Sequence, residues 1–228
     1  MSVFETAALA CPSCGSSVDV ELVHSVNAVR RPDLRAAILD RSFQSVACPS
    51  CGTTFRVEPR FTYLDVGRKQ FVAALPASEL IDWKAAEARA QGAWDKAFGK
   101  GSDGEALGRD MQARCTFGWL GLNEKLIAHE HGIDDVALEL AKMATMRSLG
   151  DVKVGADREF RLVGATGDEL IVGWLRTSSE EIDDEYGVPR QLLAEIDADP
   201  EAWAALRADV SGGMFVDYRR ALFDASPR

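Results

Sequence analysis

The sequence CPSCG occurs twice in the first quarter of the chain, at residues 11–15 and again at residues 48–52. In each copy two residues separate the cysteines, so a tight turn can direct both thiolates toward one point. The proline restricts φ to the value that such a turn needs, and the glycine after the second cysteine can adopt a positive φ without steric cost. We therefore expect the two turns to organise the surrounding chain around a bound metal ion.

The four cysteines predict one tetrahedral site with Cys11, Cys14, Cys48 and Cys51 as its ligands. Four thiolates complete the coordination of Zn²⁺ and leave no position for water, so the expected cofactor is one structural Zn²⁺. An iron ion stays an alternative, because an all-thiolate tetrahedral site suits both metals. The 33 residues between Cys14 and Cys48 exceed the usual spacing of about 15–20 residues. A folded insertion is therefore expected between them.

Two other uses of the cysteines compete with metal binding. Two cysteines separated by two residues also form the motif of thiol–disulfide oxidoreductases, but that motif usually occurs once, at the start of a helix. Here each copy is followed by glycine and strand-like residues. Structural disulfides need an oxidising compartment, and residues 1–6 lack the basic and apolar regions of a secretory signal. We expect a cytoplasmic protein.

Composition and charge limit the function classes. The chain has 228 residues, of which 46% are hydrophobic and 27% charged, as in a soluble protein of one or two domains. It contains no run of 18 apolar residues, so no membrane-spanning helix is expected. The net charge is −10; residues 1–76 carry eight basic and seven acidic side chains, and the remainder carries 18 and 29. This acidity disfavours binding to nucleic acids and anionic membranes.

The first part of the chain is predicted to form a small antiparallel sheet. Strands are expected at 18–24, 43–47, 54–58, 61–66 and 70–75, with a helix at 32–40 as the insertion. A helix over 78–98, capped by Ser78, is expected to follow. The segment Gly99–Gly104 is typical of a linker. The predicted domains are therefore 1–98, a zinc-ribbon sheet with a trailing helix, and 105–228, an acidic α-rich part.

The second part is expected to be mostly helical with one hairpin. The expected helices run from Asn123 to His131, from 135 to 149 after an Asp134 cap, over 190–196 and over 200–209, and the hairpin pairs 158–164 with 169–176. Residues 180–185 are expected to form a solvated acidic loop, with a docking surface or a cation site as alternatives. A final helix or extended piece is expected within 215–223. The predicted fold class is therefore α+β.

The doubled Cys-Pro-x-Cys motif resembles the bacterial CpXC family, which is named for it. The segments 61–65 and 71–76 look like the continuation of that family's sequence, and 122–127 with 132–135 resembles it more loosely. The resemblance implies a zinc-binding domain in which the four cysteines named above are the ligands. It implies no particular activity.

Other candidate sites are weaker. Cys115, His129 and His131 could form a second metal site, but histidines two apart on a helix point about 200° apart. His24 could replace a thiolate only in an irregular ribbon. Arginines are frequent within residues 30–41, which keeps a nucleic-acid patch open, although acidic residues are interleaved with them.

These patterns lead to one main functional hypothesis. No sequence motif of a catalytic or nucleotide-binding site is present, so no catalytic residue is assigned. We expect a structural-zinc protein that acts as a protein–protein interaction module with an unknown protein partner. The alternatives are a nucleic-acid-binding zinc ribbon that uses the arginines at 30–41, and a thiol–disulfide redox protein.

Overall fold

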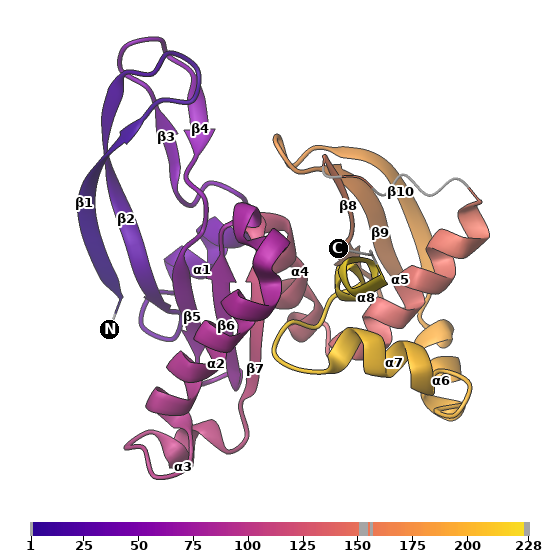
Figure 1. Cartoon of the computed structure of the whole chain (residues 1–228). Coiled ribbons are helices and arrows are strands. Elements are labelled where there is room, and N and C mark those ends of the chain that lie inside the picture. Colours follow the sequence, from indigo (N-terminus) through magenta and orange to yellow (C-terminus); the bar gives the residue numbers. More distant parts are fainter. Residues whose placement is uncertain (1, 151–154, 156, 226–228) are drawn as a thin grey trace. The chain divides into compact units, whose positions relative to one another are not determined.

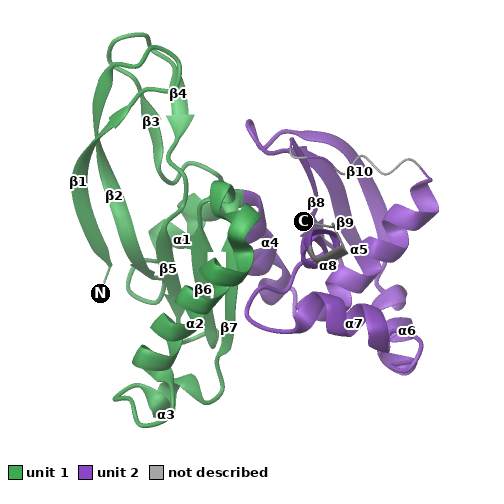
Figure 2. Ribbon diagram, viewed as in Figure 1, with its two compact units in different colours: residues 1–119 green, residues 120–228 purple. Residues whose placement is uncertain are grey.

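The chain folds into two compact units, Met1–Trp119 and Leu120–Arg228 (Figure 2). The computed structural model describes residues 2–150, 155 and 157–225, and these combine helices with three sheets, which confirms the α+β class. Among these residues no helix is both long and apolar enough to span a membrane. The domain boundary expected at 99–104 stays a prediction, because a division into compact units does not test which segments fold alone.

The first unit contains a five-stranded sheet in the order β1-β2-β5-β6-β7 (Figure 1). Its strands are β1 (Val3–Ala10), β2 (Ser17–Asn27), β5 (Phe61–Asp65), β6 (Gln70–Leu75) and β7 (Gln112–Phe117). β1–β2 and β5–β6 are antiparallel, whereas β2–β5 and β6–β7 are parallel. The expected wholly antiparallel sheet was wrong, because each parallel pair is joined by a connection long enough to contain a helix.

The helices of this unit are α1 (Pro32–Leu39), α2 (Trp83–Phe98) and the short α3 (Glu105–Gly108). The predicted helix over 78–98 is interrupted, since Ala77–Asp82 forms a 3₁₀ helix and α2 begins after Asp82. Ser78 therefore lies inside the 3₁₀ segment and is not an N-cap. The Phe71 ring of β6 packs at 5.1 Å from Trp94 and 6.0 Å from Phe98, both on α2. These ring contacts hold α2 against one face of the sheet.

The remaining strands of the first unit, β3 (Ser45–Ala47) and β4 (Thr54–Arg56), form a separate antiparallel pair. Three rings lie near its base: Phe43 packs edge-to-face on Phe61 at 5.8 Å and on Trp119 at 6.0 Å. The guanidinium of Arg56 stacks 3.7 Å above the Trp119 ring, and the indole N–H of Trp119 donates to the Val57 carbonyl at 2.9 Å. The β3–β4 pair is thus fixed to the larger sheet by aromatic and cation–π contacts.

The second unit packs helices on a three-stranded antiparallel sheet of order β10-β9-β8. Its elements are α4 (Gly118–Glu130, which begins two residues before the unit), α5 (Asp135–Leu149), β8 (Arg158–Ala165), β9 (Glu169–Arg176), β10 (Ile182–Pro189), α6 (Gln191–Ala198), α7 (Ala204–Ser211) and α8 (Tyr218–Ala225). The predicted hairpin is β8–β9. Asp134 caps α5 by accepting from the Ala137 N–H at 2.8 Å, as expected.

Two expectations for the second unit were wrong. Asn123 does not begin a helix, because α4 starts at Gly118 and Asn123 lies inside it, 7% exposed. Residues 182–185 are not loop; they pair with β9 as part of β10. The Asp183 carboxylate lies 2.8 Å from Arg176 and 3.1 Å from Arg158, so this one acidic side chain is paired within its own sheet.

Candidate metal centre

Each CPSCG motif forms the same hydrogen-bonded turn. In the first, the Cys11 N–H donates to the Ser16 carbonyl at 2.8 Å and the Gly15 N–H donates to the Cys11 carbonyl at 2.9 Å. In the second, the Cys48 N–H donates to the Thr53 carbonyl and the Gly52 N–H to the Cys48 carbonyl, both at 2.9 Å. The two motifs therefore build one local structure twice.

The two turns close two hairpins at equivalent points of their ladders. The β1–β2 ladder ends at the pair Ala10 and Ser17, and the β3–β4 ladder ends at the pair Ala47 and Thr54. Each turn thus spans the six residues between a paired alanine and a paired hydroxyl residue. The two ladders end at equivalent positions, and the four cysteines of the two turns lie together.

All four sulfur atoms lie within 4.8 Å of one another, and no disulfide joins them. The Sγ of Cys11 is 3.8 Å from that of Cys51, and the Sγ of Cys14 is 3.7 Å from that of Cys48. A tetrahedron with metal–sulfur bonds of about 2.3 Å has sulfur–sulfur edges of about 3.8 Å. The sulfur positions therefore match an all-thiolate metal site.

One cysteine of each pair faces the interior. Cys11 and Cys48 are each 2% exposed, whereas Cys14 and Cys51 are exposed. The buried pair belongs to an apolar cluster with Val18 and Val20 of β2, and this cluster includes side chains from both hairpins. A metal bound here would tie together the two hairpins beside this small core.

The thiols are arranged to ionise unequally. The Ser16 hydroxyl and backbone N–H lower the pKa of Cys14, and the hydroxyl and N–H of Thr53 lower the pKa of Cys51 to about 6. The Cys14 N–H also acts to lower the pKa of Cys11, but burial and the neighbouring sulfurs raise that pKa to about 11. Four sulfurs at this spacing can all be thiolates only if a cation neutralises them.

A family model described as CpXC protein matches residues 9–142 of the chain, a segment that contains both turns. The chain belongs to the CpXC family. No curated protein and no solved structure matches it. The resemblance inferred from the doubled motif is therefore confirmed.

The CpXC chain does not assemble the other metal sites considered from its sequence. Among the described residues, the four-cysteine cluster is the one group of three or more potential ligands with this proximity. His24 accepts or donates a hydrogen bond with Glu5 at 2.8 Å, and Cys115 is 1% exposed within β7. Neither Cys115 nor the histidines at 129 and 131 join a cluster in the part of the chain that the structure describes.

The arginines at 30–41 are largely engaged within the chain. Arg31 donates to Asp33 through Nε and Nη2 at 2.6 to 3.1 Å, and its guanidinium lies 5.8 Å from the centre of the Phe4 ring. Arg35 and Arg41 have interactions of their own. Three of the four arginines in this segment therefore interact with other residues of the chain.

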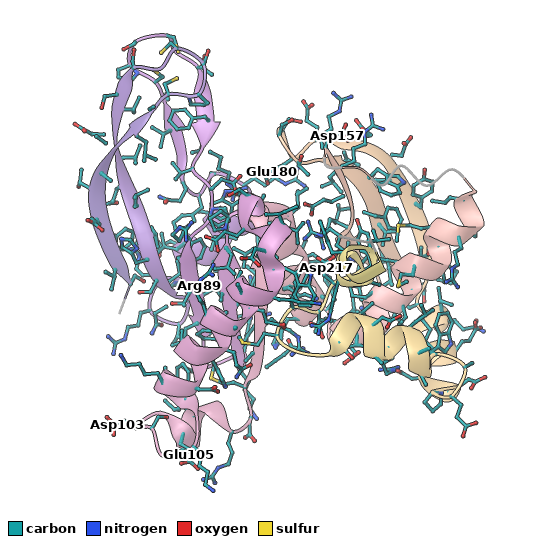
Figure 3. The ribbon with its side chains drawn as sticks, viewed as in Figure 1. Arg89, Asp103, Glu105, Asp157, Glu180 and Asp217 are labelled. Atoms are coloured by element: carbon teal, nitrogen blue, oxygen red, sulfur yellow. The ribbon has the colours of Figure 1, made fainter. Side chains whose placement is uncertain are left out.

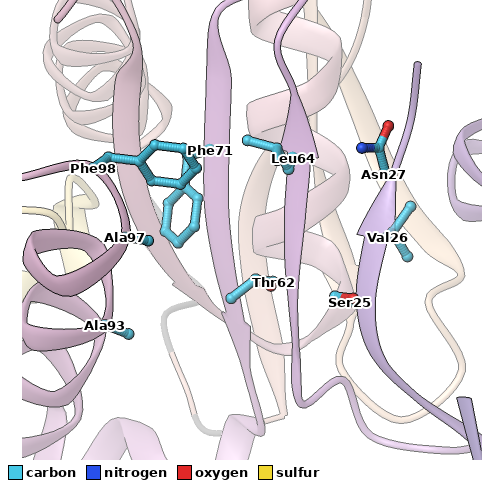
Figure 4. Close-up of a pocket in the computed structure, with 9 residues that line it drawn as sticks. All are labelled: Ser25, Val26, Asn27, Thr62, Leu64, Phe71, Ala93, Ala97 and Phe98. Carbon is cyan, nitrogen blue, oxygen red and sulfur yellow. The ribbon is translucent and has the colours of Figure 1, made fainter. Parts of the chain in front are cut away.

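A groove and a pocket lie elsewhere in the first unit. The groove, about 510 Å³, is lined by apolar side chains including Phe4 and Leu34, by polar ones such as Gln44, and by the charged residues Glu21 and Arg31. The pocket, about 240 Å³, lies between the sheet and α2, and Figure 4 labels its nine lining residues. None of these nine residues is ionisable, so the pocket lining offers no side chain that acts as an acid or a base.

The second unit contains a buried network of charges that was not expected from the sequence. It comprises nine ionisable side chains, each 0% to 7% exposed: Glu124, Lys125, Asp135, Glu139, Lys142, Glu159, Arg161, Asp217 (labelled in Figure 3) and Arg219. Glu124 lies at its centre and accepts from Lys142, from Arg161 and from the Leu162 N–H at 2.7 to 2.9 Å.

Burial and the neighbouring charges shift the pKa values of Glu124 and Glu139 in opposite directions. Burial alone would raise the pKa of Glu124, but the charges on Lys142, Arg161 and Lys125 lower it to about 2. Burial raises the pKa of Glu139 to about 7, although Lys142 opposes the shift. The signal in the sequence was that Glu and Lys occur among the apolar residues of the predicted helices. The sequence alone did not show which residues of other elements pair with them. The network is buried and its acidic and basic groups form ion pairs with one another, so we infer a structural role for it.

Proposed function

We propose that the four thiolates hold one structural Zn²⁺ and that this CpXC protein acts as a non-catalytic binding module in the cytoplasm. The metal assignment rests on one observation. Two turns with the same hydrogen bonds place four cysteine sulfurs within 4.8 Å of one another. Soft thiolate donors select zinc or iron over hard cations. Zinc is preferred because all four ligand positions are filled, as in structural zinc sites.

The arrangement supports a structural rather than a catalytic metal. Catalytic zinc keeps an open position for water or substrate. Here the protein supplies four sulfurs, and two of them, on Cys11 and Cys48, are buried against the apolar cluster between the hairpins. The metal would therefore add to this small apolar cluster in holding the two hairpins together.

The binding role rests on what surrounds this centre. The groove of about 510 Å³ beside β2 and β3 combines apolar side chains with polar ones and one residue of each charge, Glu21 and Arg31, while the pocket lining contains no ionisable group. Grooves of this kind suit extended or helical protein segments. Four free thiols without a disulfide also fit a reducing compartment.

The redox alternative fits less well. Reactive Cys-x-x-Cys pairs lie at helix N-termini, where the helix dipole stabilises the thiolate. Both pairs of this chain lie in turns that connect strands, and sulfur contacts of 3.8 Å and 3.7 Å run between the two motifs. This geometry favours one shared ion over two dithiols.

The experiment is elemental analysis of protein purified without added metal, combined with a thiol titration before and after denaturation. The proposal predicts about one zinc per chain, four thiols protected in the native protein, and their release by a chelator. Iron in place of zinc would correct the metal and keep the structural role. Metal-free protein with reactive native thiols would contradict the proposal and favour redox chemistry.

A further inference from the structure

Strand β1 is the outer strand of the five-stranded sheet, with β2 on one side (Figure 1). Between Val3 and Ala10 none of its residues is buried, and Glu5 is its one charged side chain. An exposed edge of this length is a template for pairing with another strand unless charges, proline or bulges block it. The one irregularity of the ladder lies at its start, between Val3 and Phe4.

Another edge of the described chain carries the protection that β1 lacks. The edge strand β10 contains Asp183, Asp184 and Glu185 and ends at Pro189. These charges and the proline discourage pairing with a further strand. In β1 the corresponding features are limited to Glu5 and the irregularity between Val3 and Phe4.

The backbone of β1 points its free groups outward at alternate residues. The Cys11 N–H donates to the Ser16 carbonyl, so odd-numbered positions bond toward β2 and even-numbered positions point away. A second observation agrees, because the Val23 N–H and the Glu21 carbonyl of β2 bond away from β1, to the side chain of Gln44, at 3.3 and 2.7 Å. Their partners in β1, at positions 4 and 6, therefore also point away from β2.

We propose that β1 pairs with β1 of a second copy of this chain, antiparallel and about a two-fold axis at Ala7. This register joins the outward-facing Thr6 to Ala8 of the second copy and Phe4 to Ala10. Glu5 then faces Leu9, so the two glutamates lie four residues apart along the strands and like charges do not meet. The small side chains at positions 6, 8 and 10 let the two backbones approach.

This inference rests on the proposed binding function and names a second copy of the chain as the partner. It depends on strand β1 and not on the identity of the metal. A contact made by one strand per chain is small, so the dimer is expected to be weak and concentration-dependent. An isologous contact of this kind closes after two copies. The chain is therefore predicted to form dimers and not filaments.

The first test is sedimentation equilibrium over a roughly hundredfold range of protein concentration. The wild-type mass should rise from one chain to two, and Ala8→Pro should stay at one chain throughout. Proline is tolerated there by the β1–β2 ladder because the Ala8 N–H points away from β2. Ala8→Val keeps the N–H and is the matched control, which should dimerise as the wild type does.

The second test is specific for register and does not need the proline variant to fold. In metal-loaded protein, Ala7→Cys should form an interchain disulfide under mild oxidation, because residues facing each other at the two-fold axis have Cα atoms about 4.5 Å apart. Thr6→Cys should not, since its opposite residue is Ala8. A wild-type chain that stays monomeric at every concentration, or dimers that persist in Ala8→Pro, would overturn the inference. Metal analysis of the same samples separates this failure from a failure of the proposed function.

Discussion

Gly15 and Gly52 have the same backbone conformation, with φ of 73°, at equivalent positions of two turns that are 37 residues apart in sequence. A side chain at either position would contact no other atom within 4 Å, so the need for glycine is conformational and not steric. A left-handed conformation costs a residue with a β-carbon about 1–2 kcal/mol. Both turns therefore carry the same local constraint.

Gly52→Ala is predicted to lower the free energy of unfolding by about 1–2 kcal/mol through strain in the turn, and to weaken metal retention. Asparagine tolerates positive φ better, so Gly52→Asn should cost less. Gly92 lies within α2 with open space around it, so Gly92→Ala should stabilise the protein by about 0.5–1 kcal/mol. Denaturant titrations of the three variants check this order. Equal effects of alanine at 52 and 92 would contradict it.

Cys48→Ser is predicted to reduce bound metal from about one ion per chain to nearly none. The substitution removes a buried ligand and leaves three thiolates around a weaker donor. Cys115→Ala is the matched control, since Cys115 is also buried but lies outside the cluster. Elemental analysis and limited proteolysis between residues 11 and 51 should show metal loss and faster cleavage for Cys48→Ser alone. Full metal occupancy in Cys48→Ser would exclude it as a ligand.

Lys142→Met is predicted to destabilise the second unit by about 3–5 kcal/mol. Its Nζ lies 2.8 Å from both Glu124 and Glu139, and its removal leaves two buried carboxylates without their shared cation. The double variant with Glu124→Gln should lose less than the sum of the two single changes, because these residues form one network. Chemical denaturation followed by tryptophan fluorescence gives the values.

The matched control for this network is the exposed pair of Arg31 and Asp33, whose side chains are 44% and 59% exposed. Arg31→Met should leave the unfolding midpoint unchanged, because exposed ion pairs contribute little. If Lys142→Met were as mild as Arg31→Met, the buried network would not stabilise the unit.

The stability of the second unit should depend on pH through Glu139. Its carboxylate lies 2.8 Å from Lys142 and 3.6 Å from Lys125, and it shares the buried network with Glu124 and Asp217. Burial raises the pKa of Glu139 from 4.5 to about 7. Between these values the folded chain retains a proton that the unfolded chain has released, so stability falls as pH rises, by at most about 1.4 kcal/mol per pH unit.

Glu139→Gln replaces the titrating carboxyl group by an amide that does not titrate. The wild type should therefore lose stability relative to this variant as pH rises from 5 to 7. At lower pH a second effect appears: the pKa of Glu124 is about 2 and that of Asp217 is well below normal, so their stabilisation is lost as pH falls below about 4. Wild type and Glu139→Gln with parallel stability profiles from pH 5 to 7 would show that Glu139 does not titrate there.

The parts of the structure predicted correctly from the sequence are those encoded locally. The CPSCG turns, the helix that begins at Pro32, the Asp134 cap and the β8–β9 hairpin each depend on residues close together in the chain. Their φ restrictions, caps and turn residues act over a few positions. The meeting of the two turns also followed from the sequence, because one metal site needs four ligands.

The parts that were missed depend on pairing between distant segments. β1 contains Glu5, Ala7, Ala8 and Leu9, which favour helix, and it is a strand because β2 pairs with it. β7 pairs with β6, although α2 and α3 lie between the two strands in the sequence. The extended conformation of β7 therefore depends on this pairing. The ion pair of Glu124 with Arg161 joins residues 37 positions apart. No periodicity within a short window contains this information.

The most direct test of the central claim is X-ray absorption spectroscopy at the metal edge on protein as purified. The account predicts a zinc edge and a first shell of four sulfurs at about 2.3 Å, with no nitrogen or oxygen neighbour. A first shell that contains nitrogen or oxygen, or fewer than four sulfurs, would contradict a closed four-cysteine centre at residues 11, 14, 48 and 51.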